Sequence, residues 1–173
     1  MTATIELESV PFIQKFKLIA SDNKTEFIID EKILNQSAVL KEMMEIQDKS
    51  DTEITIPLNQ ISAECLGNVI KFCKHYEDSE PYLPPIGPTA CLSRPSQSHW
   101  DMVFLKSLSS KQLFDIINAA NFLNISRLID AGCFRLGYMT ENRTVEEIRR
   151  IFQESGDFSA VEEEQIRNEP LWN

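Results

Sequence analysis

The spacing of apolar residues changes after residue 29 from every second position to every third or fourth position, and this change most constrains the fold. Over 15–21, Phe16, Leu18 and Ala20 fall on one face at a period of two, which predicts a β-strand. The stretch 26–29 can do the same after a turn at Asn23, a residue type that tolerates a positive φ. We therefore expect a β-hairpin.

The next segments predict helices around a third strand. Ser37 suits the N-cap of a helix over 38–47, in which apolar residues recur four positions apart. The stretch 54–56 predicts a short strand that stops at Pro57, and Ser62 suits the N-cap of a second helix. The order strand, strand, helix, strand, helix favours a small sheet covered by helices, the α+β class, over a doubly wound parallel sheet.

A proline-rich stretch interrupts this pattern. Residues 77–99 hold five prolines, several serines and only isolated apolar residues, and they exceed the length of an ordinary connection. We predict a mobile surface loop there. Order resumes at 100–105, and the pair Ser109 and Gln112 is a capping-box pattern that opens a helix through Phe122.

The C-terminal part of the chain predicts three further helices. Ser126 suits the cap of the first, which Gly137 is expected to stop. The capping boxes Thr144-x-x-Glu147 and Ser159-x-x-Glu162 predict two short helices on either side of Gly156. Each short helix carries too few apolar residues to be stable alone, so we expect a neighbour to cover them.

The charge of the chain limits its partners. The formal net charge is −10 and the isoelectric point is about 4.7. Contacts with a phosphate backbone depend on clustered Lys and Arg, and the longest basic run here is Arg149-Arg150. Nucleic acid and anionic membranes are therefore excluded as expected partners, and a basic or amphipathic protein surface fits better.

The cysteines and the N-terminus indicate an intracellular protein. The first residues lack the pattern of a signal peptide, and no apolar run approaches the length of a membrane span. Cys65 and Cys73, eight residues apart on one predicted helix, would lie about 12 Å apart by helical rise, too far for a disulfide. We expect free, buried thiols and a location in the cytosol or the nucleus.

The sequence offers little for catalysis. It contains no Gly-rich phosphate loop and no G-x-S-x-G motif, and His75 and His99 are its only histidines. Cys73 and His75 are too close in sequence for a usual zinc pair. Cys91 with His99 is more simply a thiol in a loop, and the acids 162–164 more simply suit a helix N-terminus. We predict no metal, no cofactor and no enzymatic activity.

Several short strings, in one order along the chain, resemble one known family. At the C-terminal end they are Met139-Thr140, Thr144-x-Glu-Glu-Ile-Arg149, Asp157-Phe-Ser159, Glu162-Glu163, Gln165-Ile-Arg167 and Trp172. Upstream they are Phe16-Lys-Leu18, Ser21-Asp22, Asn35-Gln-Ser37, Ile56-Pro-Leu58, Trp100-Asp101, Phe104-Leu-Lys106, Leu113-Phe-Asp115 and Ala119-Ala-Asn-Phe-Leu123. Together they are similar to the Skp family, the adaptors that join cullins to F-box proteins in SCF ubiquitin ligases.

The resemblance implies a BTB/POZ fold with a C-terminal extension of two helices. Residues 1–11 would be a flexible N-terminal extension, 12–137 the BTB/POZ head with the mobile loop 77–99, and 138–173 the F-box-binding helices. It also implies a non-catalytic role in protein ubiquitination and degradation, with substrate choice left to the F-box partner.

The family's binding residues carry over to particular positions of this chain. Asn121 and Phe122 would bind the cullin; the family usually has Tyr where this chain has Phe122, which puts one hydrogen bond of that contact in doubt. The F-box surface would comprise Ile125, Leu128, Ile148, Ile151, Phe152, Phe158, Ile166 and Trp172. For Ile125, Leu128 and Ile148 the alternative is a place in the internal core. Trp172 stands two residues after Pro170, almost at the chain end, where an interface anchor is the stronger interpretation.

Two other readings of the same head stay open. A self-assembling BTB/POZ scaffold would bind its own kind, and a weak homodimer of the free chain is possible without partners. An Elongin-C-like adaptor would share the head but would leave the segment after Gly137 without a counterpart.

Overall fold

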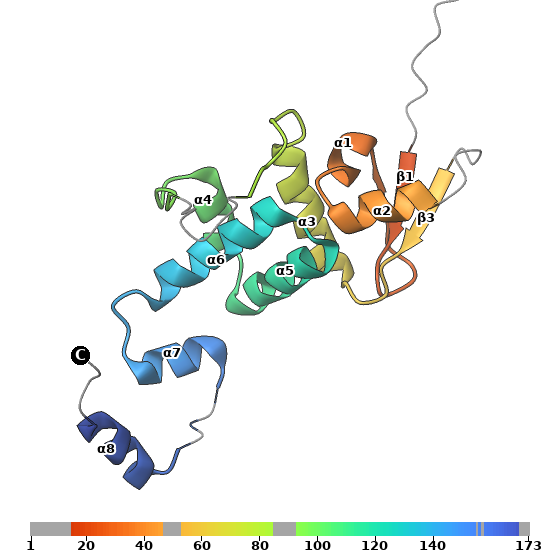
Figure 1. Cartoon of the computed structure of the whole chain (residues 1–173). Helices are drawn as coiled ribbons and strands as arrows, with labels where there is room; N and C mark the ends of the chain where they lie inside the picture. The colour runs from red at the N-terminus through yellow and green to blue at the C-terminus, as the bar shows by residue number, and fades with distance from the viewer. Residues whose placement is uncertain (1–14, 47–52, 85–92, 155, 157, 170–173) are drawn as a thin grey trace, which may run out of the picture.

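The computed structural model describes residues 15–46, 53–84, 93–154, 156 and 158–169, and it confirms the α+β class (Figure 1). Its sheet has three strands, β1 (Lys15–Ile19), β2 (Glu26–Ile29) and β3 (Glu53–Pro57), in the order β2-β1-β3. β1 pairs antiparallel with β2, placing Phe16 opposite Ile29, and parallel with β3, placing Leu18 opposite Ile56.

The predicted hairpin is present. Asn23 has a φ of 53°, as its turn requires. The Asp22 carboxylate accepts hydrogen bonds from the Lys24 and Thr25 backbone N–H groups and from the Thr25 hydroxyl. These donors favour the charged form and lower the pKa of Asp22 to about 2.

Eight helices are found among the described residues. They are α1 (Glu31–Leu34), α2 (Ala38–Ile46), α3 (Ala63–His75), α4 (Trp100–Lys106), α5 (Ser110–Leu123), α6 (Ser126–Thr140), α7 (Val145–Phe152) and α8 (Ala160–Asn168). In Figure 1 the sheet lies at one end with α1 and α2, α3 and α5 lie in the middle, and α7 and α8 lie at the other end. None of these helices has the length and apolar character that a membrane span needs.

One core runs from the sheet to α6. The inner face of the sheet, with Phe16 and Leu18, packs with the apolar stripes of α3 and α5, including Leu66 and Ile116, and all four side chains are at most 1% exposed. Farther from the sheet, Phe72 on α3 contacts the rings of Trp100 and Phe104 on α4 and of Tyr76 just after α3. These aromatic contacts extend the core to α4, which packs against α6.

The helix predicted over 38–47 ends at Ile46 and the one predicted through Phe122 ends at Leu123, and three larger differences from the sequence predictions occur. Residues 31–34 form the short helix α1, which the sequence did not predict. α6 is preceded by Ile125 at its N-cap, so Ser126 is its first residue and not its cap. Gly137 lies inside α6 and does not end it. The helical hydrogen bonding continues to Thr140, and the helix ends where the backbone of Glu141 becomes extended.

The prediction of free thiols is confirmed for Cys65, Cys73 and Cys133, and Cys91 lies outside the described residues. The prediction that the thiols are buried is wrong for Cys133, which is exposed because it lies on the solvent side of α6. Burial raises the pKa of Cys65 to about 11, with Asp115 and Glu64 nearby, and that of Cys73 to about 12.

Candidate partner-binding surfaces

The last turn of α5 presents the two residues predicted to bind a cullin. α5 begins at a capping box, in which Ser109 accepts from the Gln112 backbone and Gln112 from the Ser109 backbone. Its buried stripe points Ile116 and Leu123 inward, which leaves Asn121 exposed and the Phe122 ring 40% exposed. A large aromatic side chain on an otherwise polar helix face is typical of an interface anchor.

A shallow pocket of about 350 Å³ lies beside the Phe122 ring. It is lined by Gln60, Ile61, Ser62, Cys65, Lys111, Asp115, Asn118, Ala119 and Phe122, which come from α5, α3 and the turn before α3. The sequence reasoning named only the Phe122 end of this surface. Four of the missed residues, Lys111, Asp115, Asn118 and Ala119, lie on α5 itself. The other four, Gln60, Ile61, Ser62 and Cys65, lie more than 45 positions earlier in the chain, so only the packing of α3 on α5 reveals them.

The backbone after Phe122 is held firmly. Asn124 adopts a left-handed conformation with a φ of 50° and ends α5. The buried Ser37 hydroxyl donates to the Leu123 carbonyl at 2.5 Å, and the Ala38 N–H donates to the Asn124 carbonyl at 3.3 Å. The start of α2 thereby fixes the end of α5, so Phe122 is displayed from a rigid site.

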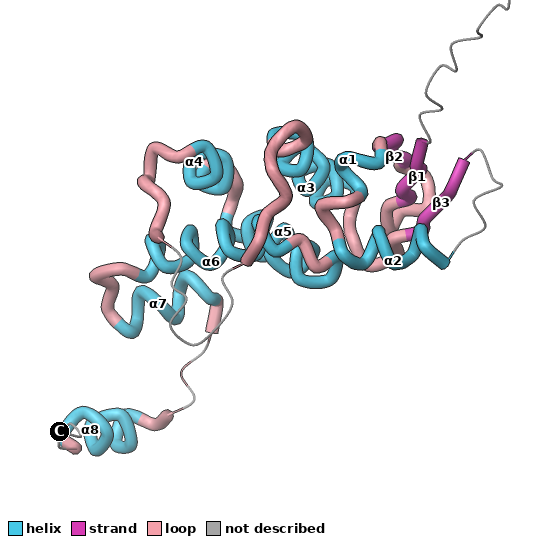
Figure 2. Tube along the Cα trace, turned by 45° about the horizontal axis from the view of Figure 1, so that its top comes forward, coloured by secondary structure: helices cyan, strands magenta, loops and turns pink. Residues whose placement is uncertain are grey.

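The tail, which we define as residues 141–169, presents a second apolar surface. On α7, Ile148 and Ile151 are partly buried, whereas Phe152 is 38% exposed. The Phe152 ring contacts that of Phe114 on α5, with 5.6 Å between centroids. Figures 1 and 2 both show α7 beside α6 and α8 farther from the head.

α8 adds an open apolar groove to this surface. Phe158 is 53% and Ile166 51% exposed, and with Val145 they line a groove of about 350 Å³ whose rim carries Glu146, Arg149 and Arg167. Val145, which is 60% exposed, was missed by the sequence reasoning. Its spacing of three from Ile148 was the signal that could have found it.

Both tail helices have the predicted capping boxes. Thr144 pairs reciprocally with Glu147 at the start of α7, and Ser159 with Glu162 at the start of α8. Hydrogen bonds from the Thr144 and Ser159 backbone lower the pKa of Glu147 and Glu162. Because their folded pKa is lowered, these carboxylates stabilise the helix starts above the unfolded Glu pKa and lose that effect as the pH falls.

The remaining predicted F-box residues have different places. Ile125 is 3% and Leu128 0% exposed, so both belong to the core of the free chain. This agrees with the alternative, given in the sequence analysis, of a place in the internal core. Their contact with an F-box stays a prediction. Trp172 lies outside the described residues. Among the described residues no cluster of His, Cys, Asp or Glu is suited to a metal ion.

Two family models match the chain. "Skp1 family, tetramerisation domain" covers residues 14–78, and "Skp1 family, dimerisation domain" covers residues 126–173. The chain belongs to the Skp1 family. The two matched ranges hold the sheet with α1 to α3 and the helices α6 to α8 of this Skp1-family chain.

Curated members of the Skp1 family align along most of the chain. The "Suppressor of kinetochore protein 1" of Schizosaccharomyces pombe is 34% identical over 161 residues, which is 92% of this chain and 98% of the relative. The "S-phase kinase-associated protein 1 homolog" of Tetrahymena thermophila is 34% identical over 159 residues, 91% of this chain and 93% of the relative. An "E3 ubiquitin ligase complex SCF subunit sconC" of Arthroderma otae is 33% identical over 158 residues, with coverage of 91% and 93%.

Proposed function

We propose that this Skp1-family chain is a non-catalytic adaptor of an SCF-type ubiquitin ligase, in which the head binds a cullin and the tail binds an F-box protein. The observation that carries the proposal is the separation of two exposed apolar surfaces. One is the Phe122 end of α5, and the other is the groove of Val145, Phe158 and Ile166. A bridging protein needs two such surfaces that can be occupied at once.

The order of elements and the names of the relatives support this function. The described sheet and the helices α1 to α6 agree with a BTB/POZ head, and α7 and α8 with an appended pair of helices. A relative with 33% identity is named as a subunit of an SCF ubiquitin ligase. A place in the cytosol and nucleus, where cullins and F-box proteins would be met, forms part of the proposal.

Reconstitution from purified parts tests the bridge. The full chain, the N-terminal part of a cullin and an F-box protein are mixed in pairs and together, and complexes are separated by size. We expect the chain to bind each partner alone and to form a ternary complex, and we expect no complex of cullin and F-box protein without the chain. If neither partner binds, the adaptor function is wrong.

The self-assembling scaffold is separated from the adaptor by the native mass of the free chain. One copy has a mass of 19.9 kDa. We expect this mass at low micromolar concentration, with any homodimer dissociating when an F-box protein is added. A homodimer that persists at nanomolar concentration and excludes the partners would support the scaffold instead.

A further inference from the structure

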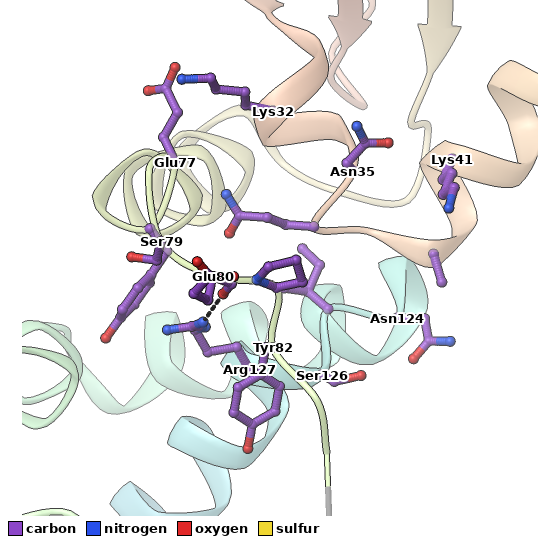
Figure 3. Close-up of a pocket in the computed structure, with 15 residues that line it drawn as sticks. Lys32, Asn35, Lys41, Glu77, Ser79, Glu80, Tyr82, Asn124, Ser126 and Arg127 are labelled. Carbon is purple, nitrogen blue, oxygen red and sulfur yellow. Dashed lines mark hydrogen bonds between the residues drawn. The ribbon is translucent and has the colours of Figure 1, made fainter.

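The stretch between α3 and α4, residues 76–99, which we call the insert, is anchored to α6 at both of its described ends. At the first end, the guanidinium of Arg127 on α6 lies over the rings of Tyr76, at 4.1 Å, and Tyr82, at 5.1 Å. Arg127 Nη2 donates to the Glu80 carbonyl at 2.9 Å, as Figure 3 shows. The Tyr82 hydroxyl donates to Asp130 Oδ2 at 2.6 Å. This end of the insert therefore fixes the first turns of α6.

The second end of the insert holds the opposite end of α6. The Arg94 guanidinium lies 3.6 Å from the centroid of the Tyr138 ring, and Arg94 Nη2 pairs with Glu141 Oε2 at 3.1 Å. The Tyr138 hydroxyl donates to the Pro95 carbonyl at 2.6 Å. We call Arg94, Pro95, Tyr138 and Glu141 the clamp. The prediction that the loop is mobile stays untested, but these described ends have defined contacts.

The clamp lies at the hinge between head and tail. Glu141 is the C-cap of α6, and its N–H donates to the Gly137 carbonyl at 3.1 Å. The Arg143 N–H donates to the Thr140 carbonyl at 3.3 Å, and Thr144 is already the N-cap of α7. Only two residues separate Glu141 from that cap. The direction in which α7 leaves the head therefore depends on how the last turn of α6 is held.

Among the described residues, α7 contacts α6, and it contacts α5 through the ring pair of Phe114 and Phe152. None of the residues of α7 is fully buried. A short helix with so little burial takes its order from its anchors, and an anchored binding surface loses less conformational entropy when a partner binds.

We propose that Arg94 is a positioning residue for F-box capture, acting through the clamp to pre-orient α7 and its apolar groove. The proposal rests on the adaptor function proposed above. Arg suits the place because a planar guanidinium can stack on the Tyr138 ring and pair with the Glu141 carboxylate at once, which Lys cannot do equally well. Arg94 lies outside the ranges that the family models match, whereas Tyr138 and Glu141 lie inside one of them. The clamp therefore joins the insert to the range that contains the tail.

The exposure of the clamp separates its role from that of the core. The side chains of Arg94 and Glu141 are 40% and 48% exposed, so an isolated ion pair between them would stabilise the fold little. Removing Arg94 should therefore loosen the hinge without unfolding the head. That distinction can be measured.

Three full-length variants test the proposal: Arg94→Ala, Arg94→Lys and Lys106→Ala. Lys106→Ala is the control, because it also removes an exposed cation, here from the last turn of α4. We expect Arg94→Ala to weaken F-box binding by about three- to tenfold, Arg94→Lys to fall between it and the wild type, and Lys106→Ala to match the wild type. Hydrogen exchange of the free chain should quicken at amides 145–152 in Arg94→Ala but stay unchanged at 110–123. The cullin affinity and the melting temperature of all three variants should equal those of the wild type.

Two results would overturn the proposal. The first is unchanged exchange at 145–152 or unchanged F-box affinity in Arg94→Ala. The second is a loss of cullin affinity and thermal stability together with F-box affinity, since that would make Arg94 a general structural residue. Failure of the adaptor function looks different, because the wild-type chain itself would then bind no F-box protein.

Discussion

The head and the tail are built from the same local signals but are stabilised differently. Capping boxes open α5 in the head and both α7 and α8 in the tail. α3 nevertheless buries six residues, whereas α7 buries none fully and the described side chains of α8 are all exposed. A helix start can therefore be fixed by its caps while its apolar face still lacks a partner. In this chain the described core lies in the head, and the apolar side chains of the described tail are exposed or only partly buried.

The strongest test of this comparison removes the tail. Because α6 continues to Thr140, the chain should be cut after Asn142, so that Tyr138 and Glu141 remain. We expect the shortened chain to stay folded and to bind a cullin with unchanged affinity, since the core ends at α6. F-box binding should be lost or severely weakened, as measured by titration of a labelled F-box protein.

Circular dichroism melts supply the control for the truncation. A shortened chain that melts close to the wild type confirms an independent head. If it binds the F-box protein as tightly as the full chain, the division of labour between head and tail is wrong.

A pair of alanine substitutions separates core from surface within the predicted F-box set. Leu128 is 0% exposed and Ile166 is 51% exposed. Leu128→Ala should lower the free energy of unfolding by about 2–5 kcal/mol, because it removes buried methyl groups and leaves a cavity. Ile166→Ala should leave stability nearly unchanged and weaken F-box binding by about tenfold.

Urea unfolding and F-box titration of both variants decide this pair. The comparison fails if Ile166→Ala destabilises the chain as much as Leu128→Ala does. It also fails if Leu128→Ala is as stable as the wild type, since Leu128 would then contribute little to the core.

The head surface is tested by the double substitution Asn121→Lys and Phe122→Lys. Two charges at a close-packed interface would have to be desolvated without partners, which should cost about 2 kcal/mol or more of cullin affinity. F-box binding should persist, because both positions are exposed and their loss leaves the core intact. Unchanged cullin affinity would remove this surface from the binding site, and unfolding would place Phe122 in the core.

The sequence predicted the features that depend on neighbouring residues. The turn at Asn23, the caps Ser37, Ser62 and Ser109, and both tail boxes are local hydrogen-bonding patterns, and all occur in the structure. Period alone could not separate a core position from an interface position. For Leu128 the sequence left both places open, and the structure shows that it is buried, whereas Ile166 is exposed.

Long-range packing was beyond sequence reasoning. The parallel pairing of β1 with β3, the pocket between α3 and Phe122, and the contacts of Arg94 with Tyr138 all join residues far apart in the chain. In the insert, scattered apolar residues predicted a mobile surface loop. The attachments of its described ends are aromatic rings, a guanidinium and backbone carbonyls, which carry no periodic signal.

The last comparison concerns thiol reactivity inside the head and on the outer face of α6, and it involves no binding partner. Only thiolates react readily with alkylating reagents. Burial raises the pKa of Cys65 to about 11 and of Cys73 to about 12, two or more units above the usual 9.0, so at pH 8 their thiolate fractions fall about a hundredfold or more. Cys133 is exposed.

In a Cys91→Ser background we therefore expect iodoacetamide to label Cys133 first in the native chain, followed by Cys65 and last by Cys73. Peptide mapping by mass spectrometry gives the order, and denatured protein, in which all three should react alike, serves as the control. A buried thiol can be labelled only when the structure around it opens locally. Slow labelling of Cys73 would therefore also show that α3 rarely opens. Equal native rates at Cys73 and Cys133 would mean that the head core is far more open than its burial indicates.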